Sequence, residues 1–162
     1  MSEVRQFKLM GKNLILICNM LLQDQDLCKL LLYTTKNPLS EPTIVDTDSL
    51  MNKNIRVIPK MPDEASEKGS FVTVLLDEFV VDEDNEQVKA ITIRFDVICP
   101  LDEWVLNTDS LRPFLIMNQI QEKFQGARLN GIGTLKFIGA DRVSFSDYYG
   151  GYSMVFTNHG FN

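Results

Sequence analysis

The stretch SFVTVLLDEFVVDEDNEQVKAITIRFDVIC, from Ser70 to Cys99, decides the fold. Two runs rich in β-branched and aromatic residues, 71–81 and 88–98, flank the acidic segment 82–86. Such residues fit the pleated surface of a sheet, and a polar break between two runs is typical of a hairpin. The stretch therefore predicts two long antiparallel strands joined by an acidic tip.

The two predicted strands differ in how their apolar residues are distributed. In the second strand, apolar and polar residues alternate over 91–97, which indicates one buried face and one solvated face. In the first strand both faces are apolar, so the strand is either central and covered twice, or covered on its outer face by another subunit. The residues predicted for a subunit interface are Phe71, Val72, Val74, Leu76 and Val80.

Helical patterns lie on both sides of the hairpin. Apolar spacing predicts one helix over 12–33, or two shorter helices over 12–22 and 25–33, because the polar residues 23–26 interrupt the pattern. A later helix is expected to be capped by Asp109 or Ser110 and to end at Gly126. Its predicted buried side consists of Leu111, Phe114, Met117, Ile120 and Phe124.

Short strand patterns complete the chain. They cover 55–58, 135–138, 142–145 and 152–156, with Gly139 marking a turn or bulge. Residues 1–10 are expected to form an N-terminal arm, 34–54 a long loop and 158–162 a C-terminal tail. The whole predicts one α+β domain over 1–162, with a mainly antiparallel sheet, a long β-hairpin and helices packed on one face.

Composition and charge limit the classes of function. The chain has 162 residues and a net charge of −6, which argues against general affinity for a nucleic-acid backbone because phosphate binding needs clustered Lys and Arg. Cys18, Cys28 and Cys99 have no metal-ligand spacing and are expected to be small core residues. The apolar run 14–22 is too short to span a bilayer, so we expect a cytosolic chain without a membrane segment.

No motif in the sequence predicts catalysis, a cofactor or a metal site. The single histidine, His159, lies close to the C-terminus, where a catalytic triad is improbable. Asp82, Asp84 and Glu86 alternate as calcium ligands do. However, Gln87 stands where a calcium loop needs its glycine, and Ile93 stands where the loop needs its bidentate glutamate. A solvated turn or an acidic functional surface is therefore favoured.

The order of elements resembles that of the phage tail-terminator and tail-completion proteins of the head–tail connection. The matching segments are 14–33, 71–98, 111–125 and 135–156, and the run LCKLLLYTT (Leu27–Thr35) before Pro38-Leu39-Ser40 is similar to sequences of phage structural modules. The resemblance implies a non-enzymatic virion protein, assembled in the host cytoplasm. It would form a ring, typically a hexamer, that caps the tail tube and joins it to the head.

In such a ring the hairpin and the first helix would supply subunit contacts. The partners implied are the tail tube protein and proteins on the portal side of the neck. DNA would pass through the channel without specific binding, because an acidic lining repels phosphate. Asp82, Glu83, Asp84 and Glu86 are the residues expected to line this lumen or to face a neighbouring ring.

Two alternatives remain open at this stage. One is another neck protein, such as a connector adaptor or stopper, which would form a different ring. The other is a small-molecule-binding or enzymatic α+β domain with a pocket between Trp104 and the turn 148–152. Asp102, Glu103 and Asp147 would be its polar groups, although ordinary turn acids explain these residues better.

Overall fold

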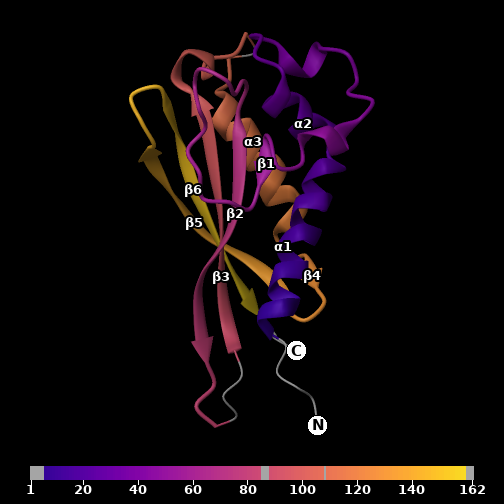
Figure 1. The fold of residues 1–162 in the computed structure, drawn as a ribbon, viewed down its shortest axis with the longest axis vertical. Helices are drawn as coiled ribbons and strands as arrows, with labels where there is room; N and C mark the ends of the chain where they lie inside the picture. The colour runs from indigo at the N-terminus through magenta and orange to yellow at the C-terminus, as the bar shows by residue number, and fades with distance from the viewer. Residues whose placement is uncertain (1–5, 85–87, 108, 160–162) are drawn as a thin grey trace.

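A computed structural model describes residues 6–84, 88–107 and 109–159. Its elements, in chain order, are α1 (Gln6–Leu22), α2 (Gln25–Leu32), η1 (Pro38–Ser40), η2 (Thr47–Leu50), β1 (Ile55–Arg56), β2 (Phe71–Val81), β3 (Val88–Pro100), η3 (Leu101–Glu103), α3 (Arg112–Phe124), β4 (Arg128–Leu129), β5 (Gly133–Ser144) and β6 (Tyr149–His159). The strands form a sheet in the order β1-β2-β3-β6-β5-β4 (Figure 1). The β1–β2 pair is parallel and the other pairs are antiparallel.

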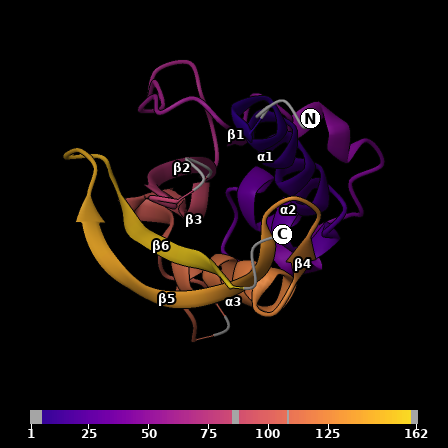
Figure 2. The ribbon, with the colours of Figure 1, turned by 90° about the horizontal axis from the view of Figure 1, so that it is seen from below.

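The sheet curls around the three α-helices, which lie on its concave face (Figure 2). Phe95 of β3 occupies the centre of the core. Its ring centroid lies 5.2 Å from that of Phe124 in α3 and 5.4 Å from that of Phe156 in β6. Each such aromatic pair adds roughly 0.5–1.5 kcal/mol beyond area burial. The predicted α+β class, the mainly antiparallel sheet, the long hairpin and the placement of helices on one face are thereby confirmed.

Two helices, rather than one, form the N-terminal region. Asp24 is the N-cap of α2, and its carboxylate accepts the N–H of Leu27 at 3.0 Å, which satisfies a donor that the helix leaves unpaired. The same carboxylate accepts the side-chain amide of Gln119 in α3 at 3.1 Å. The prediction of an arm over 1–10 was wrong for residues 6–10, because they form the first turns of α1; residues 1–5 lie outside the described part.

The start of α3 differs from the prediction. Leu111 is the N-cap and no side chain caps the helix, so neither Asp109 nor Ser110 has the expected role. The reason is that the preceding chain folds back on itself. The N–H of Leu106 donates to the carbonyl of Ser110 at 3.0 Å, and the N–H of Arg112 donates to the carbonyl of Trp104 at 2.7 Å.

The buried side of α3 is consequently rotated from the predicted one. Ile116, Ile120 and Phe124 are fully buried, whereas Phe114 is exposed and Met117 is only partly covered. The Phe114 ring instead lies 5.3 Å from the ring of Tyr152, at the periphery of the core.

The C-terminal strands are longer than expected. The patterns at 135–138 and 142–145 fall almost entirely within one strand, β5, and the β5–β6 register shifts between Phe137 and Gly139, at the predicted bulge. Strand β6 continues to His159. The predicted tail over 158–162 was therefore wrong for residues 158 and 159, because they complete the pairing with β5.

A fully buried arginine joins the elements at one end of the molecule. The guanidinium of Arg112 donates to the carbonyls of Leu30 at 2.6 Å, Tyr33 at 2.9 Å, Thr35 at 2.7 Å and Glu103 at 3.0 Å. Two of these acceptors belong to the last turn and C-cap of α2, where carbonyls lack partners within the helix. Arg112 thus ties α2, the loop after it and η3 to the start of α3.

The carboxyl group of Glu103 lies close to this cluster. One of its side-chain oxygens, Oε1, is buried without a hydrogen-bond partner in the described structure. Burial raises the pKa of Glu103 above its ordinary value, and the charge of Asp102 adds to the shift while Arg112 opposes it. Folding therefore makes ionisation of Glu103 less favourable than in the unfolded chain.

We expect Glu103→Gln to raise the melting temperature at pH 7. Because the pKa is raised on folding, this carboxyl contributes stability while it is protonated, and that contribution is lost as the pH rises through the folded-state pKa. Glutamine stays neutral, so the difference from the wild type should shrink below about pH 4. Melting curves at both pH values check this. Glu64→Gln, at an exposed position, controls for the removal of one charge; equal gains from both variants would contradict the expectation.

The three cysteines are buried and free. Burial raises the pKa of Cys18 to about 11 and that of Cys28 to about 12. Burial also raises the pKa of Cys99 to about 12. All three are therefore neutral thiols at physiological pH, and they have the core role predicted for them.

Candidate assembly surface

The hairpin extends past the end of the sheet as a two-stranded arm. We use "the arm" for residues 77–84 and 88–91. Pairing of β3 with β6 ends at Thr92, whereas pairing of β3 with β2 continues through Val88 (Figure 1). Over the arm, β2 and β3 therefore pair with each other and with no other described strand.

Side chains from β6 occupy the point where the arm leaves the body. The N–H of Ile91 donates to Oδ1 of Asn158 at 2.8 Å, and the carbonyl of Ile91 accepts the hydroxyl of Thr157 at 3.2 Å. The Asn158 amide also donates to the carbonyl of Ile132 at 3.1 Å. The backbone pairing of β3 with β6 ends at Thr92, and these side-chain bonds hold the next residue, Ile91. The arm therefore begins at a defined position.

The arm has apolar side chains on both faces. Phe79 and Val81 alternate with Val80 along β2, and these side chains are 38%, 49% and 41% exposed. Phe79 lies on the inner face, where its ring centroid is 5.5 Å from that of Phe7 in α1. Directly paired residues of an antiparallel pair share a face. Phe79 pairs with the core-facing Ile91, whereas Glu78 and Val80 pair with Thr92 and Ala90 and lie on the outer face. These three neighbouring apolar side chains make the arm a candidate interaction surface.

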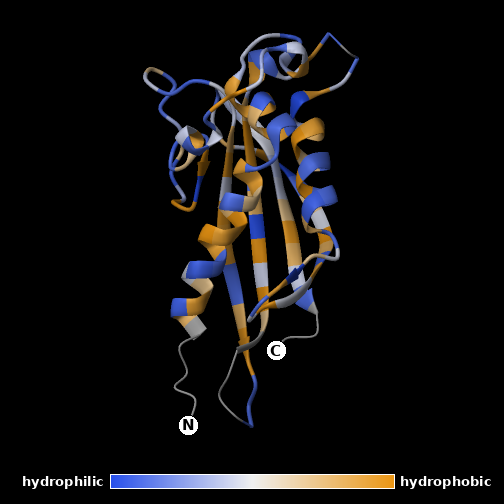
Figure 3. Cartoon of the chain, turned by 90° about the vertical axis from the view of Figure 1, so that its right-hand side faces the viewer, coloured by the Kyte–Doolittle hydropathy of each residue, from blue (hydrophilic) through white to orange (hydrophobic). Residues whose placement is uncertain are grey.

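Acidic residues follow the apolar ones toward the tip, where the hydrophobic strand gives way to hydrophilic residues (Figure 3). Glu83 and Asp84 are exposed and Asp82 is partly covered, since its carboxylate accepts the N–H of Asp84 at 2.9 Å in a local turn. Glu86, the fourth acid of the prediction, lies outside the described residues. Whether these acids line a lumen stays a prediction.

The structure separates the five residues predicted for a subunit interface. Val72 and Val74 are fully buried in the core beneath the helices. Phe71 is buried on the opposite face with Ile98 and Tyr149. These three side chains are covered within one chain and are not available to a neighbour, so the double apolar pattern at the start of β2 reflects a strand covered twice.

Leu76 and Val80 remain as the interface residues of that prediction. Leu76 is partly buried against the core and Val80 is exposed. A Val74→Asp substitution would accordingly report on stability rather than on assembly.

The outward face of α1 is a second exposed surface. Leu9, Ile15 and Leu16 are 47%, 42% and 43% exposed, and Lys8 and Lys12 lie on the same side of the helix. The helix contains two lysines and no acidic residue between Gln6 and Leu22. This face is therefore basic and apolar in a chain whose net charge is −6.

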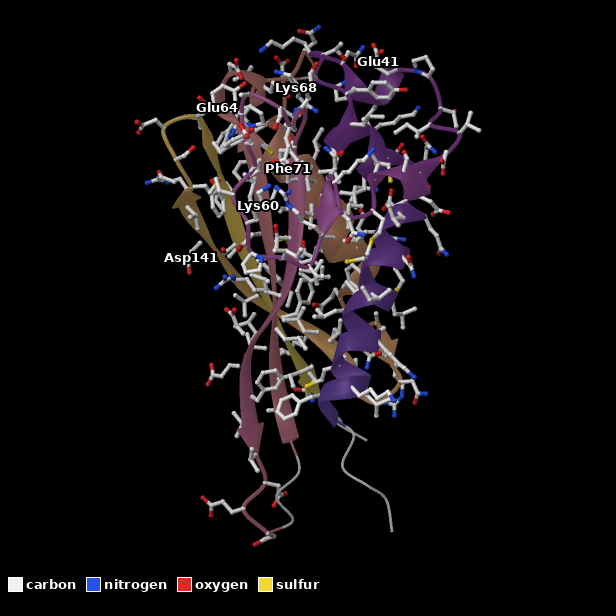
Figure 4. All side chains as sticks on the ribbon, viewed as in Figure 1. Glu41, Lys60, Glu64, Lys68, Phe71 and Asp141 are labelled. Atoms are coloured by element: carbon white, nitrogen blue, oxygen red, sulfur yellow. The ribbon has the colours of Figure 1, made fainter. Side chains whose placement is uncertain are left out.

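The outer face of the sheet carries a network of charged groups. Arg94 lies between two carboxylates, 2.8 Å from Asp77 and 3.1 Å from Asp96, and the hydroxyl of Ser153 donates to Asp96. The network joins β2, β3 and β6, which gives it a structural role. The segment 57–70, which carries Lys60 and Glu64 in Figure 4, crosses this face near Phe71. Residues 59–61 of this segment line an open pocket of about 210 Å³ together with Thr73, Arg94 and Asp96.

The region proposed for a small-molecule pocket is filled by side chains. The Trp104 ring lies 6.4 Å from the Tyr152 ring, and a methyl group added at Gly150 would lie 2.9 Å from Leu101 and 3.3 Å from Trp104. The open pocket on the outer sheet face and a second one, lined by Lys53, Ser66 and Phe71 among others, lie elsewhere. In the described part of the chain, no three His, Cys, Asp or Glu residues are grouped as metal ligands.

Sequence reasoning missed part of the candidate surface. Phe7 and Lys8 were expected in an N-terminal arm, whereas they belong to α1. Residues 6–22 contain two lysines and no acidic residue, and this pattern could have indicated an exposed basic face. A helix that is buried on all sides is apolar all round and does not carry such a face.

Fold and surface together define a small α+β protein with a projecting hairpin arm. The chain belongs to the YomW family, whose model matches residues 24–158. The family name derives from phage, which indicates a phage origin. No curated protein matches the chain. Among the described residues, no helix combines the length and the apolar character that crossing a membrane requires.

Proposed function

We propose that this protein is a structural, non-enzymatic component of the phage neck. It forms a ring, typically of six copies, that caps the tail tube and joins it to the portal side of the head. The ring leaves a channel through which DNA passes without specific binding. The protein is assembled in the host cytoplasm and remains in the virion.

The observation that carries the proposal is the exposed apolar arm. A two-stranded ribbon without a third strand is marginally stable in water, and exposing three adjacent large apolar residues on it adds a hydration cost. Phe79, Val80 and Val81 are 38–49% exposed in the single chain. Contact with another protein would remove this surface from water, and assembly into a ring provides such a contact in every copy.

The acidic residues of the arm support a place beside DNA. Asp82, Glu83 and Asp84 lie at the tip, and the chain as a whole is acidic. Clustered carboxylates repel the phosphate backbone, so a channel lined by them would let the genome slide.

The mass of the full chain in solution, measured alone and after mixing with tail tubes, tests the proposal. The wild type should form a species whose mass is a multiple of 18.5 kDa. The variant Val80→Asp/Val81→Asp should lose this species while keeping its melting temperature, because both side chains are exposed. Val45→Asp, at a valine that is 99% exposed in the long loop, is the matched control and should assemble normally. A wild type that stays monomeric under both conditions would contradict the proposal.

A further inference from the structure

We propose that the outer face of the arm of one copy docks on the outward face of α1 of the next copy. The inference rests on the proposed ring and identifies the contact that builds it. On the arm the docking residues are Glu78, Val80 and Asp82, and on α1 they are Lys8, Lys12, Ile15 and Leu16.

The two surfaces complement each other in charge and in apolar character. The arm contains five acids, all within 77–84, and one base, Lys89, whereas α1 contains two lysines and no acid. Val80 on the arm is 41% exposed, and Ile15 and Leu16 on α1 are 42% and 43% exposed. Contact would therefore bury apolar surface on both partners and pair carboxylates with ammonium groups around it.

The fold prevents the two surfaces from meeting within one chain. Helix α1 lies on the concave side of the sheet, beside the inner face of the arm, where Phe7 meets Phe79. Glu78 and Val80 lie on the opposite face of the ribbon. The docking face of the arm thus lies on the opposite side of the ribbon from α1 of the same copy, so we infer that the two faces meet between copies.

The proposed contact joins two different surfaces of the chain, the arm and α1. Two arms placed side by side would bring their acidic tips together, and two α1 helices would bring their lysines together, so like charges disfavour both self-pairings. A contact between two different surfaces repeats from copy to copy and generates a ring when the rotation closes. The arm-to-α1 contact repeated in one direction gives the ring of the proposed function, whereas a reciprocal pair would stop at a dimer, and the measured mass distinguishes the two.

Charge reversal on each surface tests the inference. Lys8→Glu/Lys12→Glu makes α1 acidic, and Glu78→Lys/Asp82→Lys makes the arm basic. Each variant alone should lose the assembled species and run at 18.5 kDa, with a melting temperature close to that of the wild type. The control Lys53→Glu/Lys136→Glu reverses two exposed lysines elsewhere and should assemble as the wild type does.

Mixing the two reversed variants should restore assembly. In an alternating ring every arm then meets an α1 face of opposite charge, and a single chain carrying all four substitutions should assemble as well. Because screening shortens the range of these charges to about 8 Å at physiological ionic strength, added salt should weaken the wild-type assembly.

The possible results separate this contact from the ring itself. If the wild type assembles and both reversed variants assemble equally well, or if mixing restores nothing, the docking inference is overturned while the proposed function stands. A wild type that remains monomeric even beside tail tubes overturns both.

Discussion

Arg112→Met is expected to lower the free energy of unfolding by about 3–5 kcal/mol. The guanidinium is fully buried and donates to four backbone carbonyls from three separate segments. Methionine fills a similar volume but donates no hydrogen bond, so carbonyls at the end of α2 would lose their partners. Urea denaturation of the full chain, with the midpoint and slope fitted separately, measures the loss.

Arg112→Lys tests whether the fork of donors, rather than the charge, is responsible. Lysine keeps the positive charge but presents it at one point, so it cannot reach carbonyls of Leu30, Thr35 and Glu103 at once. We expect it to recover less than half of the lost stability. Arg142→Met, at an exposed position on β5, is the control and should change stability by less than about 0.5 kcal/mol. A loss below about 1 kcal/mol in Arg112→Met would show that the cluster contributes little.

Gly151→Ala is expected to destabilise the fold by roughly 3 kcal/mol or more, which exceeds the usual cost of one added methyl group. A Cβ at this position would lie 1.7 Å from the carbonyl oxygen of Val97 and 2.8 Å from its carbonyl carbon. Both are backbone atoms of the neighbouring strand, so no side chain can rotate to make room. Strands β3 and β6 would have to separate at the centre of the sheet.

Gly139→Ala is the matched control for this substitution. It also lies in the sheet, but a Cβ there would meet no atom within 4 Å. Thermal melting of both variants should therefore show a large loss for Gly151→Ala and little change for Gly139→Ala. Similar melting temperatures for the two variants would contradict the prediction, because they would show that β3 and β6 can move apart at Gly151 at little cost.

Local patterns predicted most of the elements. The alternation at 91–97 and the apolar run from Phe71 indicated β2 and β3. The polar break at 23–26 left one long helix and two shorter helices open, and the structure has two. Long-range contacts decided the rest. The start of α3 follows from a fold-back in which the N–H of Leu106 donates to the carbonyl of Ser110. A capping pattern depends on residue types near the helix start, so it does not predict such a backbone hydrogen bond.

The candidate surface was harder to predict than the fold. The identity of an apolar residue in a strand does not show which part of the protein covers it. Val74 and Val80 therefore looked alike in the sequence, although Val74 is buried and Val80 is exposed. Arg112 was also missed, because a buried arginine depends on carbonyls that only the folded chain brings together. The acidic tip was predicted from charge alone, whereas the lack of acidic residues in the first helix was overlooked.

The side-chain bonds that Asn158 and Thr157 make to Ile91 have a consequence for the stability of separate regions. They lie where the β3–β6 ladder stops, and beyond them the arm is held by β2–β3 pairing alone. We therefore expect the arm to open at a lower free energy than the core around Phe95, which amide hydrogen exchange would measure. In the proposed assembly, the ordering entropy of the arm would then become part of the free energy of association.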